Sequence, residues 1–173
     1  MNEDQDTASM EIMTASERAV WLLHEFAHLA GMKLPYVYGG GHGVAPDRTF
    51  GTFPPTKGVN PEGVSPPGYD CSGWQSAGLW HAGMLGSGAI HDTNLAPGTE
   101  ELEGWGSAGP GHLFTLYVRD SGVVHHMVSK ITLPNSTPLW TAANRPGTVC
   151  GFQNFGGWDP TKEGYAARHF PGM

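Results

Sequence analysis

A cysteine at the start of a predicted helix is the residue of this chain best suited to chemistry. Residues 68–73 read Gly-Tyr-Asp-Cys-Ser-Gly, and a helix is expected from Cys71 to about Gly83. Free backbone N–H groups and the positive end of the helix dipole stabilise a thiolate at a helix N-terminus. Because a thiolate is the nucleophile of cysteine hydrolases, Cys71 is a candidate nucleophile.

Such a nucleophile needs a histidine to take its proton and a polar group to orient that histidine. The strand-like run over 123–133 contains two adjacent histidines, His125 and His126. Neighbouring side chains of a strand point to opposite faces of the sheet. Only one of the two rings can therefore face Cys71.

A second motif predicts different chemistry. Residues 24–28 read His-Glu-Phe-Ala-His, a spacing that lets two imidazoles on one helical face share a zinc ion while Glu25 activates water. Leu34 stands where an extended zinc motif has a third histidine, which leaves Glu62 or Glu100 as the third ligand. Only 23 residues precede the motif, too few for the sheet that such peptidases set beside it. A zinc metallopeptidase is therefore the alternative prediction, and the main one needs no cofactor.

The composition sets limits on partners and location. The chain has 173 residues with 39% hydrophobic side chains, which favours one domain over 15–173 behind a flexible acidic tail over 1–14. A net charge of −7 without a basic stripe argues against nucleic acid as a partner. We find no apolar run of membrane-spanning length and no signal peptide, so we expect attachment to a virion, another release route or a longer parent protein.

The predicted elements give an α+β fold. An apolar stripe indicates a helix over about 15–30. The runs 113–119 and 123–133, joined by Asp120-Ser121-Gly122, favour an antiparallel hairpin, and 139–143 predicts a third strand. The regions 43–68 and 86–112 are expected to be loops, and the tail from 146 is expected to be mostly loop. The N-terminal helix and the cysteine-headed helix should pack on this small antiparallel sheet.

Three segments resemble the NlpC-type family of papain-like cell-wall peptidases. These are Pro-Tyr-Val-Tyr-Gly-Gly at 35–40, Tyr-Asp-Cys-Ser-Gly at 69–73 and the histidine strand, within a resemblance that spans roughly 15–143. The glycine-rich loop with His42, the turn at Trp105 and the closing residues 168–172 are similar to versions in phage tail and tape-measure proteins. The resemblance implies a papain-like fold and, under one reading, a parent phage tail protein.

The resemblance also implies roles for single residues. Cys71 would be the nucleophile, His126 the base, and Tyr36 would lie beside the thiolate near the oxyanion site. We prefer His126 to His125 because Ile131 then matches a later apolar position of the family. The family places its third polar residue on the next strand, where this chain has Thr141.

For that third position, Asn135 and Asn144 stay open beside Thr141. Other residues are predicted to contact substrate: His42, Asp70, Ser72, His125 and Trp105. Asp70 has an alternative role as the cap of the helix or the anchor of the turn.

The sequence thus predicts a cysteine hydrolase that cleaves peptide or amide bonds in the stem peptides of bacterial peptidoglycan, after the precedent of D-glutamyl endopeptidases. It would act at the bacterial cell wall. Besides the zinc peptidase, a catalytically silent module of a phage tail is the second alternative.

Overall fold

A computed structural model of the chain describes residues 13–41, 68–85, 99–122 and 124–173. Most of the predicted tail over 1–14 and of the loop over 43–68 lies outside these ranges, as do His42 and Glu62. The helices are α2 (Ala15–Gly31), α3 (Cys71–His81) and α5 (Thr99–Glu103), with a 3-10 turn, η2, at Pro160–Glu163. None of the helices in the described ranges has both the length and the apolar composition that a membrane crossing needs.

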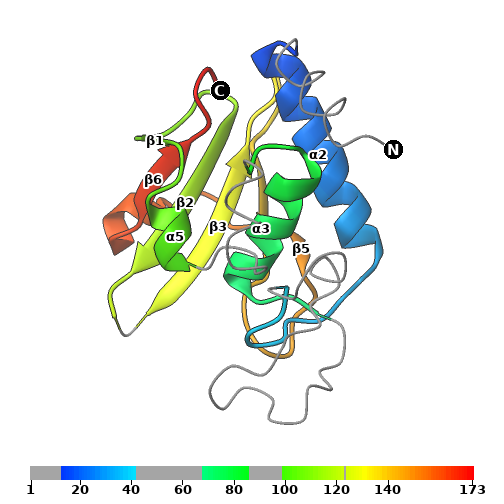
Figure 1. The fold of residues 1–173 in the computed structure, drawn as a ribbon, viewed down its shortest axis with the longest axis vertical. Helices are drawn as coiled ribbons and strands as arrows, with labels where there is room; N and C mark the ends of the chain where they lie inside the picture. Colours follow the sequence, from blue (N-terminus) through cyan, green and yellow to red (C-terminus); the bar gives the residue numbers. More distant parts are fainter. Residues whose placement is uncertain (1–12, 42–67, 86–98, 123) are drawn as a thin grey trace.

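The strands form one antiparallel sheet in the order β1-β6-β2-β3-β4-β5 (Figure 1). They are β1 (Ser107–Ala108), β2 (Phe114–Asp120), β3 (His125–Ile131), β4 (Leu139–Ala142), β5 (Gly151–Gln153) and β6 (Ala166–His169). The α+β prediction is confirmed, and so is the hairpin, now β2 and β3. The tail from 146 is mostly loop, as expected, but it also contributes β5 and β6, two short strands that pair with β4 and β2. The expectation of loop over 86–112 is wrong at α5 and β1.

The two faces of the sheet carry different clusters. Alternate residues of β2 and β3, including Leu116, Val118 and Met127, belong to the main core together with α2 and α3. Their neighbours Tyr117 and Val128 belong to a smaller cluster on the other face. Figure 1 shows α3 lying alongside β3, with α2 beside it. A side chain's position along β3 therefore decides whether it faces the helices.

The N-terminal helix begins and packs as its sequence predicts. Thr14 and Glu17 form a capping box, in which each side chain bonds the other's backbone N–H. The buried stripe of α2 includes Leu22 and Phe26, and the Phe26 ring packs 5.6 Å from the ring of Trp74 on α3. This contact packs α2 against α3, and α2 also contacts β5.

The two glycine-containing motifs form one structure. A parallel bridge joins Tyr36 to Tyr69, and the Asp70 N–H donates to the Gly40 carbonyl at 3.0 Å. The backbones approach so closely that a Cβ at Gly73 would collide with the Gly40 carbonyl oxygen and would lie 2.9 Å from the Cα of Gly41. Only glycine fits there, so this contact fixes the first turn of α3 against the turn over 38–41.

We predict that Gly73→Ala lowers the free energy of unfolding by about 1–3 kcal/mol, because the backbone atoms facing the added methyl group cannot move aside as a side chain could. Gly31→Ala is the matched control: no atom lies within 4 Å of its Cβ position, so stability should stay equal or rise by up to about 1 kcal/mol. Urea denaturation measures both. Equal effects of the two substitutions would contradict the glycine contact.

Candidate active site

Asp70 places Cys71 at the first position of α3. Its carboxylate accepts hydrogen bonds from the Gly73 N–H at 2.7 Å, the Ser72 hydroxyl at 3.1 Å and the Gly39 N–H at 3.1 Å. The predicted capping role of Asp70 is thus confirmed. Ser72 is buried and its hydroxyl is directed at Asp70, so both residues have structural roles in the free protein. Contact with a substrate stays a prediction for Asp70 and Ser72.

The Cys71 sulfur lies against the first residues of β3. The side chain is 6% exposed, and its S–H donates to the His125 carbonyl oxygen, 3.8 Å from Sγ. Burial and then the Asp70 charge raise the pKa of Cys71 to about 12, although the N–H groups of Met127, Ser72 and Cys71 itself act to lower it. The helix N-terminus therefore favours the thiolate as expected, but burial outweighs it and the thiol is neutral near pH 7.

The two histidine rings lie on opposite faces of the sheet. His125 shares its face with Met127, which belongs to the same core cluster as Cys71, and with Ser129, which bonds a side chain of α3. His126 points the other way, edge-on to the Tyr165 ring at 6.3 Å, and burial lowers the pKa of His126. Of the two adjacent histidines, His125 therefore has its ring on the face of the sheet that carries α3.

The face of the sheet on which Ile131 lies bears on the choice between the two histidines. Ile131 is buried in the core beneath the helices. It lies six residues from His125 and five from His126, and side chains an even number apart share a face. Strand geometry therefore favours His125 for the role of base that is predicted for His126.

Tyr36 lies on the segment that a parallel bridge joins to Tyr69, two residues before Cys71. Its ring is half-buried and packs against the main core. Burial raises the pKa of Tyr36 well above its usual value, and the negative charges of Cys71 and Asp70 raise it further. The phenol therefore stays protonated and can donate a hydrogen bond, and its position beside the Cys71 sulfur stays a prediction.

Thr141 belongs to a buried network rather than to the surroundings of the histidines. Its hydroxyl accepts from Trp74 Nε1 at 2.8 Å and its carbonyl from Gln75 Nε2 at 3.0 Å, while the Ser129 hydroxyl donates to Gln75. Thr141 pairs with Ser129, four residues and about 13 Å along β3 from His125. The network joins α3 to two strands, and the catalytic role predicted for Thr141 does not enter the proposal below.

Trp105 also lies away from Cys71. Its ring packs 6.0 Å from Phe114 and 6.2 Å from Phe170, and its Nε1 donates to the Met84 carbonyl. Phe114 begins β2 and pairs with Ile131, at the end of the hairpin opposite to His125. Trp105 therefore packs in the far part of the core. His42, which is also predicted to contact substrate, is outside the described residues.

The histidines of the zinc motif are exposed on α2. His24 Nδ1 lies 3.0 Å from the carboxylate of the buried Glu25, and the His24 ring stacks on Trp21 at 5.4 Å. Within the described ranges, no three potential ligands converge to hold a metal. Of the third ligands considered, Glu62 and the side chain of Glu100 lie outside the description.

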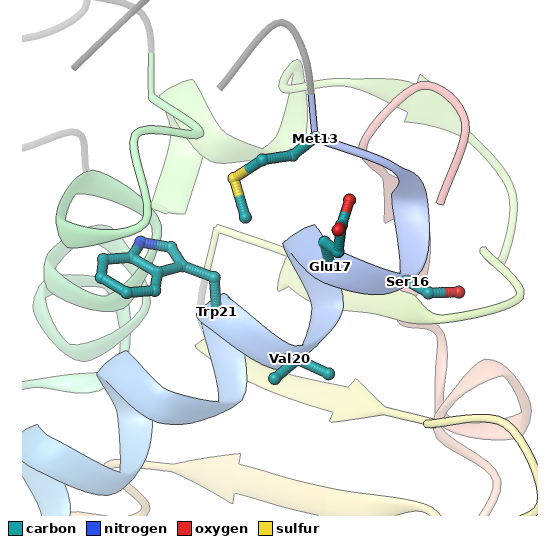
Figure 2. A pocket seen from close by; sticks show the side chains of 5 residues that line it. All are labelled: Met13, Ser16, Glu17, Val20 and Trp21. Atoms are coloured by element: carbon teal, nitrogen blue, oxygen red, sulfur yellow. The ribbon is translucent and has the colours of Figure 1, made fainter. Parts of the chain in front are cut away.

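A surface pocket of about 350 Å³ occupies another part of the molecule. Figure 2 shows it at the start of α2, and Cys71 is not among the residues that line it. It is lined mainly by apolar atoms of Met13, Val20 and Trp21, with Ser16 and Glu17 beside them. The pocket offers no group that could act with the thiol.

Asp120 is a residue whose position the sequence did not reveal. The sequence indicates a hairpin turn at Asp120-Ser121-Gly122, yet Asp120 is the last residue of β2 and lies directly opposite His125. Its Oδ1 lies 2.9 Å from His125 Nδ1. From the sequence, the pairing of Asp120 with His125 follows only if the register of the hairpin is known, and that register depends on the length of the turn.

Comparison with known proteins gives no relative: no family model matches the chain, and neither the curated proteins nor the solved structures yield a match.

We predict slow alkylation of Cys71 at neutral pH. In a Cys150→Ala background, the rate with iodoacetamide should rise about tenfold per pH unit from about pH 7 to 10, because the thiolate fraction grows until the pH nears the raised pKa. Mass spectrometry follows the modification. Cys150 is replaced because it too is a buried free thiol. A rate that levels off below about pH 8 would show a stabilised thiolate instead.

Proposed function

We propose that the chain is a papain-like cysteine hydrolase in which Cys71 attacks a peptide or amide carbonyl and His125 acts as the base. The observation that carries the proposal is the seating of the Cys71 sulfur, at the first position of α3, against the histidine-bearing start of β3. A nucleophile at a helix N-terminus beside a histidine is the arrangement that thiol hydrolysis requires.

The neutral thiol determines how the first step proceeds. Because the pKa of Cys71 is raised, His125 removes the thiol proton as Sγ attacks the carbonyl carbon, rather than forming a stable ion pair beforehand. In the free protein the S–H is directed at the His125 carbonyl oxygen, so the catalytic hydrogen bond to the ring forms on substrate binding.

The remaining steps use the same groups. The carbonyl oxygen becomes an oxyanion, and we assign its stabilisation to the Cys71 N–H and the Tyr36 hydroxyl. The imidazolium of His125 then gives its proton to the leaving amine, the C–N bond breaks, and a thioester to Cys71 is left. Water, deprotonated by His125, attacks the thioester; the acid product leaves and the proton returns to the thiol.

The proposed substrate rests on the resemblance of the two glycine-containing motifs to cell-wall peptidases. It is the stem peptide of bacterial peptidoglycan, with a bond after D-glutamate as the leading candidate. A net charge of −7 gives no long-range attraction to an acidic cell wall. Affinity must then come from local contacts or from a larger parent protein, such as a phage tail component.

We predict that Cys71→Ala abolishes the release of amino groups from purified peptidoglycan, a loss of at least about 10³-fold, because the nucleophile is gone. Cys150→Ala is the matched control; that thiol is buried against the Tyr69 carbonyl, and the variant should stay active. A chelator and His24→Ala should both leave the rate unchanged. Loss of activity on chelation would support the zinc peptidase, and an inactive wild-type protein would support the silent module.

The two histidines are separated by a second pair of variants. His125→Ala should lower kcat by about 10²–10⁴-fold, the usual contribution of a general base. His126→Asn should keep kcat within about tenfold of wild type, because that ring lies on the face turned away from α3. Circular dichroism checks that both variants fold. The opposite ranking would assign the base to His126.

A further inference from the structure

The β2–β3 hairpin brings a carboxylate to the proposed base. Asp120 and His125 are directly paired, and Asp120 Oδ1 lies 2.9 Å from His125 Nδ1. The Asp120 side chain is 16% exposed, whereas that of His125 is 52% exposed. A largely shielded carboxylate thus holds one nitrogen of the ring, and the rest of the ring stays accessible.

This contact determines where the proton of the neutral ring lies. An ionised carboxylate only accepts hydrogen bonds, so the nitrogen that faces Asp120 must carry the hydrogen. The other nitrogen, Nε2, then has a free lone pair. We propose that Asp120 is the positioning residue of the site: it holds His125 as the Nδ1–H tautomer and so makes Nε2 the atom that takes the Cys71 proton. This inference rests on the proposed function.

The topology explains why this partner comes from β2. The ladder between β3 and β4 covers Ser129–Ile131, and the described β4 ends at Ala142, opposite the residue before Ser129. A third polar residue on the following strand, as the resemblance implies, would therefore sit beyond the end of that ladder. On the other side of β3, the ladder with β2 extends to His125 itself and ends on Asp120.

Asp120 also stabilises the imidazolium once the proton has moved. After His125 takes the Cys71 proton, both ring nitrogens carry hydrogen and the ring is a cation. The adjacent carboxylate then forms a charge-assisted hydrogen bond to Nδ1, which favours that state.

Asp120 has a second contact that a test must separate from this one. Its Oδ1 accepts the Gly122 N–H at 3.2 Å, an interaction within the hairpin turn. Ser121 supports the same turn, because its hydroxyl oxygen accepts the Val124 N–H at 3.2 Å. Asp120→Asn keeps an oxygen for the Gly122 N–H and removes only the charge, whereas Ser121→Ala weakens the turn and leaves the carboxylate in place.

The first experiment reads the tautomer directly. Histidine labelled with ¹⁵N, observed by long-range ¹H–¹⁵N NMR at a pH where the ring is neutral, should show the His125 proton on Nδ1. In Asp120→Ala the ring loses its acceptor, and the signals should move toward the mixed tautomers of a solvated histidine; His125→Ala assigns the peaks. A wild-type proton on Nε2 would overturn the proposal. This measurement needs no substrate, so it decides the role of Asp120 even if peptidoglycan is not cleaved.

The second experiment measures turnover of purified peptidoglycan. Asp120→Asn should lower kcat by about 10²-fold or more with KM nearly unchanged, because the imidazolium loses its counter-charge. Asp120→Glu should restore part of the loss, and Ser121→Ala should retain wild-type kcat. If Cys71→Ala abolishes activity but Asp120→Asn does not reduce it, the result supports the hydrolase and rejects the positioning role of Asp120. An equal loss of kcat in Ser121→Ala would show that Asp120 acts only by stabilising the turn.

Discussion

The contact between two glycine-containing segments is the constraint on which the rest of the site depends. The backbone of the turn over 38–41 lies directly on the first turn of α3, and Asp70 bonds both segments through one carboxylate. The contact is possible because Gly41 and Gly73 have no side chains. It fixes the end of α3 that carries Cys71, so the sulfur is positioned by backbone packing rather than by its own side-chain contacts.

The other side of α3 is fixed by buried polar groups. Trp74 and Gln75 bond Thr141 on β4, and Gln75 also accepts from Ser129 on β3. Each of these polar atoms is satisfied inside the core, where an unpaired one would be costly. The helix is therefore held in register with the strand that carries the histidines. Thr141 contributes to the site through this network, about 13 Å along the strand from His125.

The electrostatics of Cys71 result from two opposed effects. Three backbone N–H groups favour the thiolate, while burial and the nearby Asp70 carboxylate favour the thiol, and burial is the largest effect. The thiol is therefore neutral near pH 7, and the proposed nucleophilic role requires a base at the moment of attack. The Asp70 carboxylate both raises the pKa of Cys71 and caps α3. It therefore helps to fix the position of the sulfur while it disfavours the thiolate.

The sequence by itself determined the local features: the helix that begins near residue 15, the cysteine at the head of α3, the cap at Asp70 and the β2–β3 hairpin. Each depends on residues close together along the chain, where propensity and turn chemistry act. The tertiary structure alone decided that His125 rather than His126 shares a face with α3, that Asp120 pairs with His125, and that Thr141 is enclosed in the core. It also created β5 and β6, whose three and four residues form strands only because β4 and β2 supply their partners. Register and face depend on pairing between distant segments, and a shift of one residue reverses every side chain, so local patterns leave them undetermined.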